Sequence, residues 1–226
     1  MNLLFTGASG FLGYNVLPLL KKKYSVETIG LTSQDDYIVN LAAEIPKLAG
    51  KYDVILHVAG KAHSLPKTEA EKRLFFDVNL QGTKNLCTAL EQSGIPKSFI
   101  FISTVAVYGC DSGENITEEY PLNGTTPYAL SKIKAEKYLE EWCAMHNVKL
   151  SILRPSLIAG PNPPGNLGAM IHGIKSGKYL SIAGGKAQKS VLMVQDIANL
   201  VPLLIEKGGI YNVCDSYQPS FRELEM

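Results

Sequence analysis

Short apolar runs alternate with longer amphipathic stretches along this chain, and this alternation limits the possible folds more than any other feature. The apolar runs are predicted to be strands at 3–5, 26–31, 54–58, 98–103 and 150–153. Helices are predicted near 11–23, 69–93 and 128–146. Strands and helices in alternation form a parallel sheet with helices on both faces, so we predict an α/β fold with a doubly wound parallel sheet.

The chain changes character after Arg154 and Pro155. Residues 159–166 are rich in proline, glycine and asparagine, which form turns more readily than regular elements. Only short elements are predicted beyond them, as helices at 167–176 and 196–206 and strands at 179–182 and 210–213. A short strand at 37–41 and one or two helical turns at 43–49 complete the prediction.

The composition argues against several classes of protein. The 226 residues carry a formal net charge of +1, which gives no electrostatic reason to expect a nucleic acid or an anionic membrane as a partner. No apolar run approaches the roughly 18 residues of a membrane-spanning helix. The first residues run directly into a strand without a secretion signal, so we expect a cytoplasmic protein.

The cysteines and histidines predict neither disulfides nor a metal site. The cysteines are far apart in the sequence and are expected to be free thiols: Cys87, Cys110, Cys143 and Cys214. The histidines have no metal-ligand spacing and are expected to be structural: His57, His63, His146 and His172.

Three glycines follow the first predicted strand and open the first predicted helix, within residues 6–13 (TGASGFLG). Gly7 would permit a tight turn, Gly10 would let the backbone approach a pyrophosphate, and Gly13 would let the helix pack closely on the strand. The amide groups at the start of the helix would then face the phosphates. We predict that a dinucleotide binds at this turn; a plain strand-to-helix turn is the alternative.

Tyr128 and Lys132 are four residues apart in a predicted helix, so their side chains lie one turn apart on one face. A free tyrosine has a pKa of about 10, and a nearby ammonium group lowers it. The pair is therefore a candidate acid/base group for the hydroxyl proton of a sugar or an alcohol. An exposed helix face is the alternative interpretation of the pair taken alone.

The glycine spacing and the Tyr-x-x-x-Lys pair together resemble the extended short-chain dehydrogenase/reductase family, which contains nucleotide-sugar epimerases, dehydratases and reductases. Further matching segments extend the resemblance over nearly the whole chain: 57–60 (HVAG), 77–83 (DVNLQGT), 103–109 (STVAVYG), 153–155 (LRP), 160–161 (GP), 194–196 (VQD) and 212–213 (NV). The resemblance implies a Rossmann-like doubly wound parallel sheet with a small C-terminal substrate lobe.

The resemblance also implies roles for individual residues. In the implied catalytic set, Thr104 hydrogen-bonds the reacting oxygen, Tyr128 transfers the proton, and Lys132 lowers the pKa of Tyr128 and holds the nicotinamide ribose. The implied cofactor-binding residues are Gly7, Ser9, Gly10, Phe11, Leu12, Gly13, Thr32, Asn40, Leu41, Val58, Ala59, Gly60, Asn79, Ser103, Tyr128, Lys132 and Pro155. The implied substrate-binding residues are Lys61, His63, Val105, Ser156, Asn166 and Lys189. Asn79 is expected to be mostly structural.

The implied cofactor is NAD or NADP, with a slight preference for NADP. An acidic residue about 20 residues beyond the glycine turn usually holds the adenosine ribose. The second predicted strand ends in residues 30–33 (GLTS) without an acid, and Asp35 and Asp36 come a little later. Without that acid a 2′-phosphate is not repelled, but no arginine is present to bind it, so we expect both cofactors to bind.

Epimerisation at the 4-position and reduction of a 4-keto-sugar fit the sequence better than 4,6-dehydration. Dehydratases of the family carry an Asp-Glu pair directly after the catalytic threonine, where this chain has Val105 and Ala106. Leu157 departs from the asparagine that many epimerases have there. A looser resemblance of 59–63 (AGKAH) to enzymes of UDP-linked N-acetyl sugars favours a UDP- or dTDP-linked substrate. A non-catalytic NAD(P)-binding sensor or scaffold protein is the alternative from another functional class.

We expect residues 1–155 to form the dinucleotide-binding domain, with 191–213 packing back onto it. Residues 156–226 are expected to form the substrate-binding lobe, and this lobe is expected to be incomplete because the sequence stops at the opening of a helix. By resemblance, the helices at 69–93 and 128–146 are expected to pair two copies of the chain into a homodimer.

Overall fold

The computed structural model describes residues 1–62, 64–180 and 183–225. Seven parallel strands form its central sheet, in the order β3-β2-β1-β4-β5-β6-β9. They are β1 (Asn2–Thr6), β2 (Ser25–Gly30), β3 (Tyr37–Ile38), β4 (Val54–His57), β5 (Ser98–Ile102), β6 (Lys149–Pro155) and β9 (Gly209–Val213). The order reverses at β1, which opens a crevice at the carboxyl ends of β1 and β4. The prediction of a Rossmann-like doubly wound sheet is confirmed.

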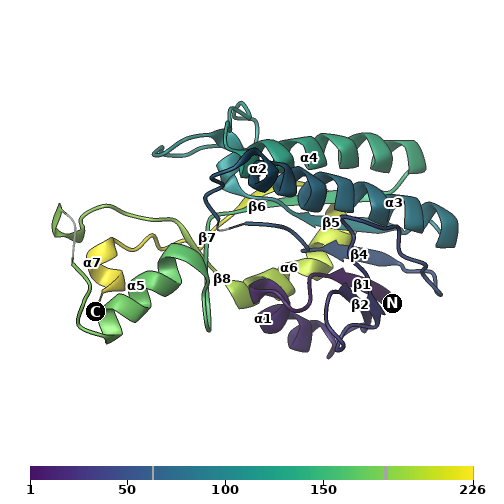
Figure 1. Cartoon of the computed structure of the whole chain (residues 1–226), viewed down its shortest axis with the longest axis horizontal. Helices are drawn as coiled ribbons and strands as arrows, with labels where there is room; N and C mark the ends of the chain where they lie inside the picture. The colour runs from purple at the N-terminus through teal and green to yellow at the C-terminus, as the bar shows by residue number, and fades with distance from the viewer. Residues whose placement is uncertain (63, 181–182, 226) are drawn as a thin grey trace.

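Helices cover both faces of the sheet (Figure 1). One face carries α2 (Glu69–Phe76), α3 (Gly82–Ser93) and α4 (Pro127–His146), and the other carries α1 (Phe11–Leu20) and α6 (Val194–Lys207). Two separate clusters of buried apolar side chains fill the space between the sheet and these two helical layers. The sheet is therefore the middle layer of three.

The inner strand β5 explains why the sheet is covered on both faces. Phe99 and Phe101 pack into the cluster under α3 and α4, whereas Ile100 and Ile102 pack into the cluster under α1 and α6. All four side chains are 5% exposed or less. Because successive side chains of a strand point to opposite faces, an unbroken apolar run requires a layer on each side.

A smaller lobe extends from the carboxyl edge of the sheet (Figure 1, left). It contains α5 (Gly165–Lys175), the short 3₁₀ helix η3 (Ala183–Gly185) and α7 (Phe221–Leu224). A separate two-stranded parallel sheet, β7 (Leu157–Ala159) with β8 (Val191–Met193), lies where this lobe meets the main body. The chain then returns to the main body, because α6 packs in the cluster under Ile100 and Ile102 and β9 pairs with β6.

Several predicted elements differ from the structure. No helix forms at 43–49, because Pro46 disfavours helical backbone at the residue before it and has no amide hydrogen to donate. The strand predicted at 37–41 contains only Tyr37–Ile38. Tyr179 and Leu180 are not in a strand, and the rest of the strand predicted at 179–182 lies outside the described residues. The sequence analysis missed β7 and β8, which are three residues each and too short to show a period.

The residues predicted to form one long helix at 69–93 are helical throughout, but they are not all α-helical. A π-helical turn, η1 (Asp77–Gln81), separates α2 from α3. Such turns occur frequently at functional sites, since they re-aim one side chain without ending the helix. None of the helices in the described ranges is long and apolar enough to cross a membrane.

Candidate active site

A cavity of about 570 Å³ lies at the carboxyl edge of the sheet, over the crevice between β1 and β4. The glycine turn, the ends of β2, β4 and β5, the start of α4 and the segment after β6 all reach it. The predicted site residues that line it are Gly7, Ser9, Gly10, Phe11, Leu12, Asn40, Leu41, Val58, Ala59, Gly60, Lys61, Ser103, Thr104, Tyr128, Lys132, Pro155 and Ser156. Residues far apart in the sequence therefore meet in one place.

Other predicted site residues are not part of the cavity wall. Gly13 and Asn79 are buried beside it, whereas Asn166 and Lys189 are exposed on the lobe. Thr32 and Val105 also lie outside the lining, and His63 lies outside the described residues.

The sequence analysis missed part of the lining, namely Ile29, Gly30, Leu31, Val39, Ala42, Ala62, Val78, Ile102, Leu157, Ile158 and Pro164. Most of these are direct neighbours of predicted residues, and their side chains have no ionisable or hydrogen-bonding group. Adjacency to a motif is the only signal that could have found them. Ile158 and Pro164 had no such signal, because the path of the lobe brings them to the cavity.

The glycine turn fits an anionic ligand. Gly7 has φ +82°, and a Cβ there would lie 2.7 Å from the amide nitrogen of Ala59. A Cβ on Gly10 would meet only one atom, the Gly7 carbonyl oxygen at 3.4 Å, so the space over Gly10 is open. The N-terminus of α1 has no capping side chain and no acid in its first turn, whereas α2 has both. The free amides of α1 are thus left for a negatively charged group.

A buried histidine orders the loop after β4. The Nδ1 atom of His57 lies 2.7 Å from the Thr6 hydroxyl, and its Nε2 atom lies 2.9 Å from the Thr83 hydroxyl. The Thr6 oxygen also accepts hydrogen bonds from the amides of Val58 and Ala59, which line the cavity. Burial, with the charge of Lys132, lowers the pKa of His57 to about 3, so the ring is neutral and structural.

Asn79 connects the π-helical turn to the cavity wall. Its Oδ1 atom accepts a hydrogen bond from the Lys61 amide at 2.7 Å, and its Nδ2 atom donates to the Lys61 carbonyl at 3.1 Å. The same Nδ2 atom donates to the Ser131 hydroxyl at 2.9 Å, and that hydroxyl donates to the Tyr128 carbonyl at 2.7 Å. Asn79 therefore ties the loop at Lys61 to the helix that carries Tyr128 and Lys132.

Thr104 and Tyr128 both line the cavity. Thr104 follows β5 and caps the 3₁₀ helix η2 (Val105–Tyr108), where its hydroxyl oxygen accepts from the Ala106 amide at 3.1 Å. That contact leaves the hydroxyl proton free to be donated. Burial raises the pKa of Tyr128 above its ordinary value, and the hydrogen bond with Thr104 partly opposes this rise.

Lys132 lines the cavity, and its ammonium group is bound to the backbone. Its ammonium group donates to the Ile102 carbonyl at 2.8 Å and lies 4.5 Å from the centroid of the Phe101 ring. Burial lowers the pKa of Lys132 to about 8, and the charge of Glu136 raises it in part. Burial raises the pKa of Tyr128, and Lys132 is not among the groups that oppose this rise, so the lowering of that pKa by Lys132 stays a prediction.

A buried ion pair lies one turn further along α4. Arg154 Nη2 lies 2.6 Å from Glu136 Oε2, and both side chains are 3% exposed or less. Glu136 also accepts a hydrogen bond from the Ser103 hydroxyl, directly before Thr104. Arg154 Nη1 donates to the Tyr108 hydroxyl at 2.9 Å. The pair thus joins α4, β6 and the end of β5 behind the cavity.

Fold and site together define the class of this protein. A doubly wound parallel sheet, a glycine turn that opens α1, and a Tyr-x-x-x-Lys helix that reaches the same cavity are the features of the extended short-chain dehydrogenases/reductases. The sequence profile of the NAD dependent epimerase/dehydratase family matches residues 3–214. The chain belongs to this family.

Similar proteins cover nearly the whole chain. It is 30% identical to the N-acetyl-alpha-D-glucosaminyl-diphospho-ditrans,octacis-undecaprenol 4-epimerase of Escherichia coli O157:H7, over 99% of this chain and 70% of that protein. It is 26% identical to the GDP-6-deoxy-D-mannose reductase of Pseudomonas aeruginosa, over 98% of this chain and 77% of that protein. The solved structure of RMD from Pseudomonas aeruginosa complexed with NADPH has a TM-score of 0.80 and 26% identity, covering 99% of this chain and 81% of that one.

Proposed function

We propose that this chain is an NAD(P)-dependent 4-epimerase or 4-keto-sugar reductase that acts on a nucleotide-linked sugar. One observation carries the proposal: the glycine turn and the set Thr104, Tyr128 and Lys132 line the same cavity. The names of the relatives support it, because they include both 4-epimerases and a reductase of sugars linked to diphosphates.

The lining residues fit a dinucleotide. The open space over Gly10 and the uncapped amides of α1 would hold the pyrophosphate, and the apolar residues at the end of β2 and after β3 would hold the adenosine. Thr104, Tyr128 and Lys132 lie at the other end of the lining, by β5 and α4. Bound there, the nicotinamide would supply the hydride exchange.

Tyr128 would exchange the proton of the sugar hydroxyl as a carbonyl is formed or reduced. Thr104 would donate a hydrogen bond to the same oxygen, because accepting from the Ala106 amide leaves its hydroxyl proton available. Lys132 would hold positive charge in a dry setting, where charge acts strongly on both groups. The proton would leave or join the hydroxyl oxygen and the hydride would leave or join the carbon that bears it, so no oxidant or reductant beyond the cofactor is needed.

Dehydration is the less favoured reaction. Val105 and Ala106 follow Thr104 directly, and neither side chain can act as an acid or a base in the elimination of water. Some relatives are dTDP-D-glucose 4,6-dehydratases, but the chain spans only 54% of the length of the mouse enzyme. Epimerisation and reduction need no group at these two positions.

For the substrate we propose a UDP- or dTDP-linked sugar. Lys61 and Ser156 line the cavity and would contact it there. Residues 156–226 would form the substrate-binding part, with Asn166 and Lys189 reaching the substrate from the lobe, and residues 1–155 with 191–213 would form the dinucleotide-binding part. Lysine is a less directional partner for a diphosphate than arginine, so Lys189 would add charge more than geometry.

A product assay tests the proposal. The chain is incubated with a panel of UDP- and dTDP-sugars, with and without reduced cofactor, and products are separated by chromatography. Interconversion of 4-epimers without added reductant indicates an epimerase, whereas consumption of reduced cofactor with a keto-sugar indicates a reductase. Tight cofactor binding without any turnover would favour a sensor or scaffold protein instead.

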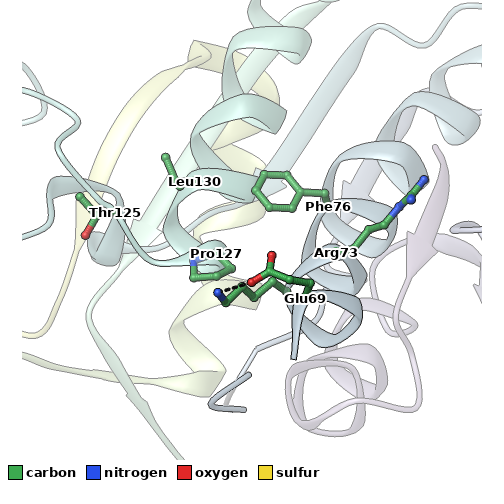
Figure 2. A pocket seen from close by; sticks show the side chains of 7 residues that line it. Glu69, Arg73, Phe76, Thr125, Pro127 and Leu130 are labelled. Carbon is green, nitrogen blue, oxygen red and sulfur yellow. Dashed lines mark hydrogen bonds and ion pairs between the residues drawn. The ribbon is translucent and has the colours of Figure 1, made fainter. Parts of the chain in front are cut away.

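We also propose that two copies pair through the helical segment at 69–93, which contains α2, η1 and α3, and through α4. An open hollow between these helices is lined by Glu69, Lys72, Arg73, Phe76, Thr125, Pro127 and Leu130, with the Lys72–Glu69 ion pair at 2.6 Å (Figure 2). Leu74 and Leu130, from the same two helices, are 45% and 38% exposed and would supply apolar area to the contact. Light scattering that gives the mass of one subunit would contradict the proposal.

A further inference from the structure

The ammonium group of Lys132 is buried with little hydrogen bonding from the protein. Lys132 is 4% exposed. Among the described residues, the Ile102 carbonyl at 2.8 Å is the acceptor that its ammonium group binds, and no carboxylate forms an ion pair with it. An ammonium group has three donors, and a buried charge is costly unless its surroundings compensate it. Another group must therefore support the charge of Lys132.

The ring of Phe101 lies where such support is needed. Nζ of Lys132 is over this ring, 4.5 Å from its centroid, which is within the ~6 Å range of cation–π attraction. The Phe101 side chain is fully buried, so water does not weaken this attraction. A Cβ atom on Gly60 would lie 3.2 Å from Nζ, so the missing side chain at Gly60 leaves the room that the ammonium group occupies.

The Phe101 ring is itself held by a neighbouring ring. His57 on β4 lies directly opposite Phe101 on β5 in the register of the sheet. The two rings are stacked, with centroids 5.7 Å apart and an interplanar angle of 26°. His57 is fixed at both ring nitrogens by the hydroxyl groups of Thr6 and Thr83. The ring that Phe101 presents to Lys132 therefore has a defined orientation.

The other charges around Lys132 leave this contact important. The titratable and charged groups on the elements around it are Tyr128, Glu136, His57, Lys61 and Arg154. Glu136 raises the pKa of Lys132, but its carboxylate is paired with Arg154 at 2.6 Å. His57 is neutral because its pKa is lowered to about 3, and burial keeps Tyr128 neutral by raising its pKa. The Lys61 ammonium group lies over a different ring, that of Phe75.

We propose that Phe101 is a positioning residue of the active site, whose ring holds the charged ammonium group of Lys132 in place at the cavity. Phe101 is not part of the cavity lining, so it acts only through Lys132. The inference rests on the proposed function, since it assigns the charge of Lys132 to the reaction. A fixed charge in a dry site acts on the reacting groups without having to reorganise.

The alternative interpretation is that Phe101 only fills the core, and Phe99 allows the two to be separated. Phe99 lies on the same strand and the same face, and it is also fully buried. Its ring contacts His57 at 6.0 Å and Trp142 at 6.2 Å between centroids. In the described part of the chain, no ammonium or guanidinium group lies over it. Phe99 is therefore a matched control for packing without a cation.

The experiment replaces Phe101 by mono-, di- and trifluorophenylalanine in separate preparations, and replaces Phe99 in the same way. Each fluorine withdraws electron density from the face of the ring, while the size and burial of the ring change little. NMR of the cofactor-free chain with lysine labelled at Cε measures the pKa of Lys132, whose signal is identified by its loss in Lys132→Met. The pH dependence of kcat/KM is then measured for each preparation.

We expect wild-type Lys132 to titrate at about 8. Its pKa should fall by about 0.5 to 1 unit along the Phe101 series, because the charged form loses its support. The decline of kcat/KM at high pH should begin at a pH that is lower by the same amount. The Phe99 series should shift neither quantity by more than ~0.2 unit.

Several results would overturn the proposal. An unchanged pKa of Lys132 along the Phe101 series, or an equal shift in the Phe99 series, would leave Phe101 with a packing role only. A shift of that pKa without a matching shift of kcat/KM would separate Phe101 from the reaction. The proposed function stands in all of these cases, because turnover continues. If the chain shows no turnover, the proposed function fails, and the NMR titration alone decides whether Phe101 holds the ammonium group.

Discussion

The end of β5 and the C-terminal lobe hold their polar side chains in opposite ways. Around β5, Asn79, Lys132 and Glu136 are buried and bound to fixed protein partners. On the lobe, Asn166 and Lys189 are exposed to solvent. Groups that move a proton need one fixed position, which burial and hydrogen bonds provide. Groups that recognise a variable substrate need access to it, which exposure provides.

The strongest test of this comparison is at Tyr128. Tyr128→Phe removes the hydroxyl that we propose transfers the proton, and we expect kcat to fall about 10³-fold while cofactor affinity stays nearly unchanged. Steady-state kinetics and a cofactor titration measure the two quantities. Tyr138→Phe, on the same helix but outside the lining, is the matched control. Equal activity of Tyr128→Phe and wild type would refute the catalytic role.

The buried ion pair tests whether the interior depends on its fixed partners. Arg154→Met leaves the Glu136 carboxylate buried without its partner, and we expect the free energy of unfolding to fall by about 3–5 kcal/mol in urea denaturation. Lys97→Met is the control, since it removes the exposed pair with Asp53 and should cost under ~1 kcal/mol. The double variant with Glu136→Leu should recover part of the loss.

The buried Lys132 should make the free energy of unfolding depend on pH. Its pKa is about 8 in the folded chain and 10.5 for the unburied group, so between these values the unfolded chain binds more protons. The free energy of unfolding should therefore rise with pH across this window, by up to ~3 kcal/mol from this group. Denaturation at several pH values checks this, with Lys132→Met as reference. An equal slope in wild type and variant would contradict it.

Substitutions on the lobe should have the smallest effects on activity, and they should change KM rather than kcat. Lys189→Ala should raise KM for the nucleotide sugar about threefold to tenfold and change kcat by less than about twofold, because an exposed charge adds binding that is equal in the ground and transition states. Lys186→Ala, an exposed neighbour, is the control. A fall in kcat at unchanged KM would indicate that Lys189 acts in the chemical step. That result would contradict the contrast between buried catalytic groups and exposed binding groups.

Periodic segments were predicted well, and segments without a period were not. The apolar run of β5 and the helix of α4 could be predicted from local sequence, and the structure has both elements close to the predicted bounds. β7 and β8 exist because two distant three-residue segments pair with each other, from Leu157 opposite Val191 to Ala159 opposite Met193. The π-helical turn was missed because α-helical and π-helical residues share the same local preferences.

The sequence by itself determined the sheet, its order of strand and helix, and the glycine and tyrosine motifs, since each depends on residues within one element. Only the tertiary structure decided the direction of the pKa shifts and the partners of the charged side chains. Burial raises the pKa of Tyr128, the Lys132 ammonium group donates to a backbone carbonyl, and a loop brings Asp35 back to Gly30. Burial and through-space distance are set by the whole chain, so spacing in the sequence cannot give them.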